Sequence, residues 1–177
     1  MKYNIVYADP PWSYSDKSLH KGGAARYYST MGLDSICSLP VESIVDDNCA
    51  LFLWVTFPHL NNAFKVINSW GFKYKTIAFN WVKKNKKSDS LFWGMGHYTR
   101  SNSEICLLGL RGKLKRVNSD VHSVLIDKVT QHSKKPFEIK KRIVRLFGDI
   151  PRIELFARDL TDGWDAWGNE VDSNILL

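Results

Sequence analysis

The sequence predicts an α/β fold in which one sheet carries helices on both faces. Short apolar runs rich in β-branched and aromatic residues alternate along the chain with segments of helical periodicity. The chain has 177 residues, of which 44% are hydrophobic, and this is enough for one compact core. We therefore expect a single domain over residues 1–177.

The chain is basic, with 25 Lys and Arg residues against 18 Asp and Glu residues and a formal net charge of +7. An excess of this size fits a polyanionic partner such as DNA or RNA. It also fits a basic surface without a specific use, and charge alone favours neither interpretation.

The three cysteines, Cys37, Cys49 and Cys106, lie far apart and form no CxxC pair. This spacing predicts free thiols in a reducing compartment and no metal site. No apolar run is long enough to span a bilayer, and no basic-then-apolar leader stands at the N-terminus. We therefore expect a cytoplasmic protein with no membrane contact.

The first segment, residues 3–8, reads as a buried strand that a prolyl pair stops directly after Asp9. Residues 13–28 are polar and glycine-rich, and loops of this length in a compact domain are usually functional or disordered. Residues 33–45 predict short helical pieces that break near Pro40.

A second strand is predicted over residues 49–55 and is followed by a helix that Pro58 opens and Gly71 closes. Four apolar residues repeat at helical spacing and predict its inward stripe: Leu60, Phe64, Ile67 and Trp70. A third strand is predicted over residues 72–82, and the basic run 83–87 follows it.

The rest of the chain continues the alternation. Residues 104–110 predict another strand, and residues 121–126 one more. Residues 137–147 form an amphipathic helix between Pro136 and Gly148, and a last strand is predicted over residues 152–156. Ligands of open α/β sheets bind outside the carboxyl ends of the strands. Because Asp9, Lys83 and Arg158 each follow a predicted strand, we expect them at one edge of the sheet.

The tetrapeptide Asp9-Pro10-Pro11-Trp12 carries the chemical argument. An exocyclic amine of a nucleobase is a poor nucleophile because its lone pair is delocalised into the ring. A carboxylate can accept one of its hydrogens and a carbonyl from a rigid prolyl segment the other, which favours a pyramidal nitrogen. The indole can stack on the base. The alternative is a strand, a rigid turn and a core tryptophan, but the whole tetrapeptide after an apolar strand favours a catalytic role.

Several motifs occur in a fixed order and resemble the MT-A70 family of adenine-N6 methyltransferases. After Asp9-Pro10-Pro11-Trp12 come Tyr28-Ser29-Thr30-Met31, Leu51-Phe52-Leu53-Trp54-Val55-Thr56, Trp81-Val82-Lys83, Ser133-Lys134-Lys135-Pro136, Glu154-Leu155-Phe156-Ala157-Arg158 and Gly168-Asn169-Glu170. The resemblance implies a Rossmann-like methyltransferase fold in permuted order, with the catalytic motif before the main cofactor-binding segment. It also implies S-adenosylmethionine as the cofactor.

The resemblance assigns roles to individual residues. It implies that Asp9 and Pro10, with Pro11 and Trp12, form the catalytic motif. The cofactor-binding positions that it implies are Asp9, Lys83, Ser133, Lys135, Pro136, Glu154, Leu155, Phe156, Arg158, Asn169 and Glu170. Some relatives have His-Asn after the arginine of the last strand, where this chain has Leu160 and Thr161. Thr161 can replace an amide as a partner of the ribose, whereas Leu160 cannot donate a hydrogen bond.

Cations and aromatic side chains alternate after the third predicted strand, and this pattern suits a nucleic-acid groove. The predicted substrate-binding residues are Trp12, Tyr28, Lys83, Lys84, Lys86, His97 and Arg100. For the outer lysines a solvated loop is the alternative. Because the segment is short, we expect little sequence readout, a short target, or a homodimer partner or second protein that supplies specificity.

The sequence thus predicts transfer of a methyl group to the N6 amine of adenine in a nucleic acid, with DNA favoured over RNA. The alternatives are an RNA adenine-N6 methyltransferase, a DNA cytosine-N4 methyltransferase and a non-catalytic nucleic-acid-binding subunit. A methyltransferase that acts on a small molecule or a protein amine is a further alternative, and the basic, aromatic segment argues against it. The intact Asp9 favours an active enzyme over such a subunit.

Overall fold

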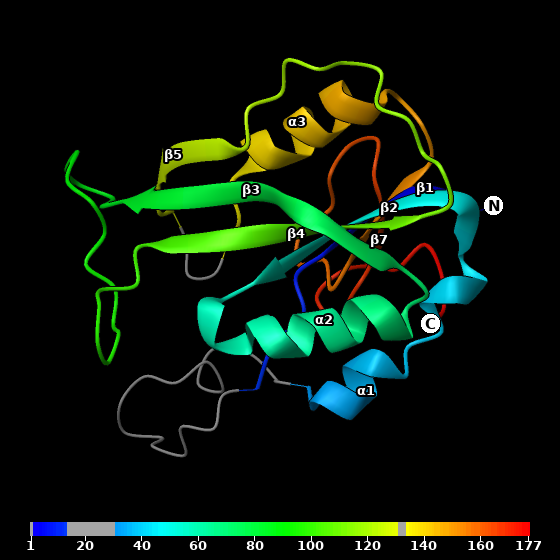
Figure 1. Ribbon diagram of the computed structural model, residues 1–177, viewed down its shortest axis with the longest axis horizontal. Helices are drawn as coiled ribbons and strands as arrows, with labels where there is room; N and C mark the ends of the chain where they lie inside the picture. Colours follow the sequence, from blue (N-terminus) through cyan, green and yellow to red (C-terminus); the bar gives the residue numbers. More distant parts are fainter. Residues whose placement is uncertain (1, 14–30, 131–133) are drawn as a thin grey trace.

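In the computed structural model, which describes residues 2–13, 31–130 and 134–177, one seven-stranded sheet runs through the molecule (Figure 1). Its strands are β1 (Tyr3–Ala8), β2 (Val45–Val55), β3 (Lys73–Lys84), β4 (Ser103–Arg111), β5 (Val124–Lys128), β6 (Arg152–Leu155) and β7 (Asp165–Trp167). Their order is β5-β3-β4-β2-β1-β6-β7. Only β4 runs antiparallel to its neighbours among these strands, and all other pairs are parallel.

Helices cover both faces of the sheet, as the sequence predicts (Figure 1). They are α1 (Leu33–Cys37), α2 (Leu60–Ser69) and α3 (Phe137–Phe147), with the short 3-10 turns η2 (Val41–Ser43) and η3 (Phe57–His59). The α3 face buries Ile139 and Ile143 against Tyr7 and Phe52. The α2 face buries Val66 and Ile67 with Leu51 of the sheet. Burial of these apolar side chains is the main force that holds the layers together.

Several predicted elements are confirmed. The strand over residues 3–8 and the helix over residues 137–147 have the predicted bounds. Short helical turns α1 and η2 lie within residues 33–45. Gly71 follows α2 with a φ of 77°, a left-handed conformation that costs glycine little.

Three predictions about the elements need correction. The residues of α2 that are fully buried are Ala63, Val66 and Ile67, whereas Leu60 and Phe64 of the predicted stripe are only partly buried. Ile67 and Trp70 of the stripe are fully buried, and Leu60 and Phe64 pack against the same core. The predicted face is therefore the inward one, and the correction is that Ala63 and Val66 belong to it as well.

The other two corrections concern strands. The basic run does not begin after β3, because Lys83 and Lys84 are its last two residues and pair with β5. The three-residue strand β7 was not predicted, because it is too short to show a period. The predicted loop over residues 13–28 lies outside the described residues except for Ser13.

The polar residues after β1, β6 and β7 meet at one edge of the sheet, the carboxyl edge of the parallel strands. Because β4 runs the opposite way, its first residues reach the same edge. Within the described ranges, no helix has the length and apolar character needed to cross a membrane.

Candidate active site

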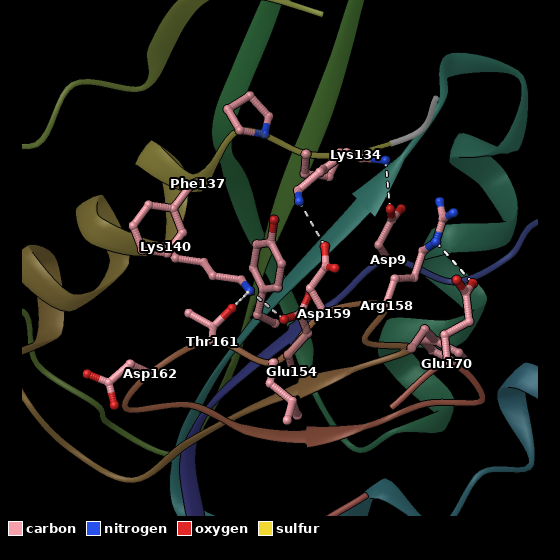
Figure 2. A pocket seen from close by; sticks show the side chains of 15 residues that line it. Asp9, Lys134, Phe137, Lys140, Glu154, Arg158, Asp159, Thr161, Asp162 and Glu170 are labelled. Carbon is pink, nitrogen blue, oxygen red and sulfur yellow. Dashed lines mark hydrogen bonds and ion pairs between the residues drawn. The ribbon is translucent and has the colours of Figure 1, made fainter. Parts of the chain in front are cut away.

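Two cavities open at the carboxyl edge of the sheet and meet at Asp9. The smaller cavity, of about 500 Å³, lies on the α3 side and is lined by Lys140, Glu154 and Thr161, among others. The larger cavity, of about 700 Å³, is lined by Pro10, Trp12, Met31, Leu39, Thr56, Glu104, Trp167 and Asn169, among others. Five residues line both: Asp9, Lys135, Phe156, Arg158 and Glu170. Figure 2 shows the smaller cavity with Asp9 at its border.

A chain of four alternating charges crosses this border. Lys135 Nζ donates to Asp9 Oδ2 at 2.7 Å and lies 3.2 Å from Glu104 Oε2. Lys83 Nζ donates to the other carboxylate oxygen of Glu104 at 2.8 Å. Of the four side chains Asp9 is the most exposed, at 27%. Asp9 and Lys135 are the two members of this row of charges that line both cavities, and Asp9 is the more exposed of the two.

The pKa values of these groups follow from burial and from how the cations are shared. Burial raises the pKa of Asp9; Lys135 lowers that pKa and Glu104 raises it further, and the net change is upward. Burial also raises the pKa of Glu104, but Lys135 and Lys83 outweigh it and bring that pKa down to about 2. Burial lowers the pKa of Lys135, yet Asp9 and Glu104 hold it well above its usual value. As pH falls, Asp9 therefore takes up a proton before Glu104 does.

The prolyl turn holds Trp12 against the floor of the larger cavity. The Pro10 carbonyl accepts the backbone N–H of Trp12 at 2.9 Å and keeps a second lone pair. The indole N–H of Trp12 donates to the Trp54 carbonyl at 3.1 Å, and its ring stacks on His59 with centroids 5.7 Å apart. Burial lowers the pKa of His59, so this stack involves a neutral imidazole at neutral pH.

An ion pair between α3 and β6 lines the smaller cavity. Lys140 is nearly buried, and its ammonium donates to Glu154 Oε2 and to Thr161 Oγ1 (Figure 2). The same ammonium lies over the rings of Tyr7 and Trp164, 5.6 and 5.8 Å from their centroids. Burial raises the pKa of Glu154, although Lys140 opposes this. Carboxylate and hydroxyl thus face the cavity together.

The end of β7 closes the site next to the turn that follows β6. Arg158 Nε donates to Glu170 Oε1 at 3.0 Å, and both residues line both cavities. Gly168 lets the end of β7 pack closely against the turn after β6, because a Cβ at that position would lie 2.3 Å from the Ala157 carbonyl oxygen. Phe156, the first residue after β6, has a φ of 61°, and this turns the chain sharply at the end of the strand.

Most of the predicted catalytic and cofactor residues lie around the two cavities. In addition to the five shared residues, Pro136 and Glu154 line the smaller cavity. The larger one is lined by Pro10, Pro11, Trp12 and Asn169. Leu155 does not line either cavity and is fully buried in the sheet. Lys83 reaches the site through Glu104.

The predicted substrate residues are divided between the cavity and a projecting loop. Lys84, Lys86, His97 and Arg100 do not line the cavities, and they lie at the end of β3 and in the loop that leads to β4. Tyr28 and Ser133 lie outside the described residues.

Four charged residues that line the cavities do not follow from the sequence: Glu104, Lys140, Asp159 and Asp162. Glu104 stands at the start of an apolar strand, and only the antiparallel direction of β4 brings it to Asp9. Lys140 lies on the apolar face of α3 beside Ile139 and Ile143. A lysine at a core position is a usable signal, since a buried cation needs a partner.

The sequence of this chain is similar to those of known methyltransferases. The MT-A70 family profile matches residues 3–170. The Type II methyltransferase M.MunI of Mycoplasma sp is 37% identical over 98% of this chain and 79% of that protein. The human N(6)-adenosine-methyltransferase catalytic subunit METTL3 is 32% identical over 99% of this chain, but the match covers only 29% of that protein. The MT-A70-like N(6)-adenosine-methyltransferase of Arabidopsis thaliana is 30% identical, and the chain spans 24% of it. The chain therefore belongs to the MT-A70 family of S-adenosylmethionine-dependent methyltransferases.

Proposed function

We propose that this protein transfers the methyl group of S-adenosylmethionine to the N6 amine of adenine in DNA. The observation that carries the proposal is the position of Asp9, whose carboxylate stands at the border of two cavities. A purine in one cavity and a methyl donor in the other would meet at this carboxylate. Such positioning of two reactants is the main task of a methyltransferase, because S-adenosylmethionine supplies an activated, electrophilic methyl group.

The smaller cavity suits the donor. Glu154 and Thr161 present oxygen atoms to ribose hydroxyls, with Lys140 holding both in place. Lys135 offers its cation to the carboxylate of the methionine part. The cavity also has the volume expected of a small-molecule site, about 300–1,000 Å³.

The larger cavity suits the base. The Asp9 carboxylate and the Pro10 carbonyl both belong to its lining and can accept the two hydrogens of an exocyclic amine. S-adenosylmethionine would supply the methyl group there: the N–CH₃ bond would form as the S–CH₃ bond breaks, the sulfonium would leave as a neutral thioether, and the proton lost from the nitrogen would pass to solvent. The negative charge of Asp9 stabilises the positive charge that develops on this nitrogen. Trp12 and Met31 give the cavity an apolar wall for the ring.

The names of the relatives support the choice of adenine, and we propose DNA on the extent of the match to the Type II methyltransferase. Two of them are named as N(6)-adenosine methyltransferases, and this favours an adenine N6 amine over cytosine N4. The Type II methyltransferase shares more identity with the chain, and the chain covers most of its length. The human relative is named as a catalytic subunit. We propose that a second copy or a second protein adds sequence specificity here as well.

The test is to incubate the protein with labelled S-adenosylmethionine and matched DNA and RNA oligonucleotides, and then to identify the methylated nucleoside. We expect N6-methyladenine in DNA. Label on cytosine N4, or on RNA alone, would contradict the proposal. The Asp9→Ala variant should lose at least about a hundredfold in transfer rate, because it lacks the charge that stabilises the transition state.

The matched control for this variant is Asp34→Ala, which removes an exposed carboxylate from α1, away from both cavities. It should methylate at the wild-type rate. If Asp9→Ala also kept that rate, the assignment of the catalytic carboxylate would be wrong.

A further inference from the structure

The loop between β3 and β4, residues 85–102, projects beyond the sheet at its carboxyl edge (Figure 1). We call this segment the finger. Large apolar side chains on it face solvent, and Trp93 and Tyr98 are 72% and 95% exposed. Leu91 and Met95 are exposed as well. Exposed aromatic and apolar groups gathered on one segment indicate a binding surface.

Hydrogen bonds fix the base of the finger. The Phe92 N–H donates to the Lys83 carbonyl, and the Lys83 N–H donates to the Asn102 carbonyl, each at 2.8 Å. The Asn85 amide donates to Ser90 Oγ at 2.8 Å and to the Leu91 carbonyl at 3.0 Å. The finger is thus anchored to the end of β3, while Trp93 and Tyr98 are exposed to solvent.

Trp93 is presented as a flat surface. The Arg100 guanidinium lies 4.9 Å from the centroid of the Trp93 indole, which is a cation–π contact. This contact steadies the ring from one side, and the high exposure of Trp93 leaves room for another flat group.

The charge around the finger identifies the class of partner. Residues 83–102 contain five cations, Lys83, Lys84, Lys86, Lys87 and Arg100, against the single acid Asp89. Phosphates match this excess, and the faces of bases match an exposed indole. A protein partner would need acidic groups around an apolar centre, whereas nucleic acid combines both features along its whole length.

The finger also begins and ends at the site. Glu104 lies two residues after the finger and lines the larger cavity. Lys83 lies two residues before the finger, and its ammonium binds the Glu104 carboxylate. A strand whose adenine enters the larger cavity therefore passes the base of the finger.

We infer that the finger binds an unpaired stretch of the DNA strand next to the target adenine, with the Trp93–Arg100 pair as a stacking surface for a neighbouring base. This inference rests on the proposed function and adds that unpaired nucleotides are preferred. Bases of an intact duplex have their faces covered by neighbours, so the indole can stack only on a base that is single-stranded or displaced.

The test uses an oligonucleotide that the wild-type protein methylates, with 2-aminopurine placed beside the target adenine. Stacking on Trp93 should quench its fluorescence. Trp93→Leu should remove this quenching and weaken binding to single-stranded DNA by about tenfold or more, whereas Trp93→Phe should keep most of both. The transfer rate at saturating DNA should stay at the wild-type value, because Trp93 does not line the cavities.

Tyr74→Leu is the matched control, because it removes an exposed aromatic residue from the far end of β3. It should change neither quenching nor affinity. Wild-type affinity in Trp93→Leu, or an equal loss on duplex and single strand, would overturn the inference. The inference would also be overturned if Trp93→Leu bound DNA like the wild type but had a different oligomeric state, because the finger would then be a protein interface. Failure of the wild-type protein to methylate any oligonucleotide would instead count against the proposed function.

Discussion

Lys135 is shared by two carboxylates, and this sharing decides which of them is available to a ligand. Glu104 has a second cation, Lys83, at 2.8 Å, and its pKa is about 2. Asp9 has Lys135 as its nearest cation and is raised in pKa by burial. Glu104 therefore stays ionised and keeps Lys135 in place, whereas the raised pKa of Asp9 makes it the first of the two carboxylates to take up a proton as pH falls.

Replacing Lys135 should move the pH dependence of methyl transfer. In Lys135→Met the cation that lowers the pKa of Asp9 is gone, so this pKa rises further. Protonated Asp9 cannot stabilise a positive nitrogen. The acidic limb of the kcat profile, measured at saturating substrates, should therefore shift to higher pH.

The neighbouring lysine provides the control for that profile. Lys134 also lines the smaller cavity, but it pairs with the exposed Asp159 at 2.9 Å and not with Asp9. Lys134→Met should leave the acidic limb where it is in the wild type. An unchanged limb in Lys135→Met would show that the Asp9–Lys135 pair does not set the pH dependence.

At the scale of secondary structure, local patterns predicted β1 and α3 but not the direction of β4. An apolar run or a helical period is a property of neighbouring residues, and both elements carry one. Strand direction depends instead on which strands pair, and tertiary packing decides this. Glu104 was missed for this reason, since it belongs to the site only because β4 is antiparallel.

The same distinction explains β7 and the end of β3. Strand β7 has three residues and forms only because β6 offers it an edge. The last residues of β3, Lys83 and Lys84, read as a charged loop, but β5 pairs with them and extends the strand. By contrast, the motif residues Asp9, Pro10 and Glu170 line the larger cavity, and the roles that the sequence assigns to them stay predictions.

Helix α3 is linked to β6 by Lys140, and removing this cation should destabilise the fold. Lys140→Met leaves the nearly buried Glu154 carboxylate without its partner, which costs about 3 kcal/mol of unfolding free energy. Urea unfolding at neutral pH measures this loss.

The double variant Lys140→Met with Glu154→Gln is the control. It removes both charges, so at least half of the lost stability should return. If the double variant were as unstable as the sum of the single ones, the ion pair would not be the cause.

At the scale of the whole molecule, the sheet gathers the acids of the site at one edge and the finger places lysines beside it. The formal net charge is +7, and the charged groups of the finger are mostly cations. A polyanionic substrate is therefore attracted to the edge that holds Asp9. The composition does not say where the positive charge acts, whereas the structure places part of it on the finger, beside the carboxyl edge of the sheet.

This location predicts how salt affects binding. Each phosphate neutralised by a lysine releases counterions, so the affinity falls linearly with salt on logarithmic axes, with a slope of about 0.7 per contact for a single strand. Lys86→Gln together with Lys87→Gln should reduce that slope by about 1.4 in total, because both lysines are exposed on the finger. Lys113→Gln together with Lys115→Gln, beyond the opposite end of β4, should not change it. Fluorescence anisotropy of a labelled oligonucleotide between low and physiological salt gives all three slopes. Equal slopes in the wild type and the finger variant would show that these lysines do not contact phosphate, and the DNA path along the finger would then be wrong.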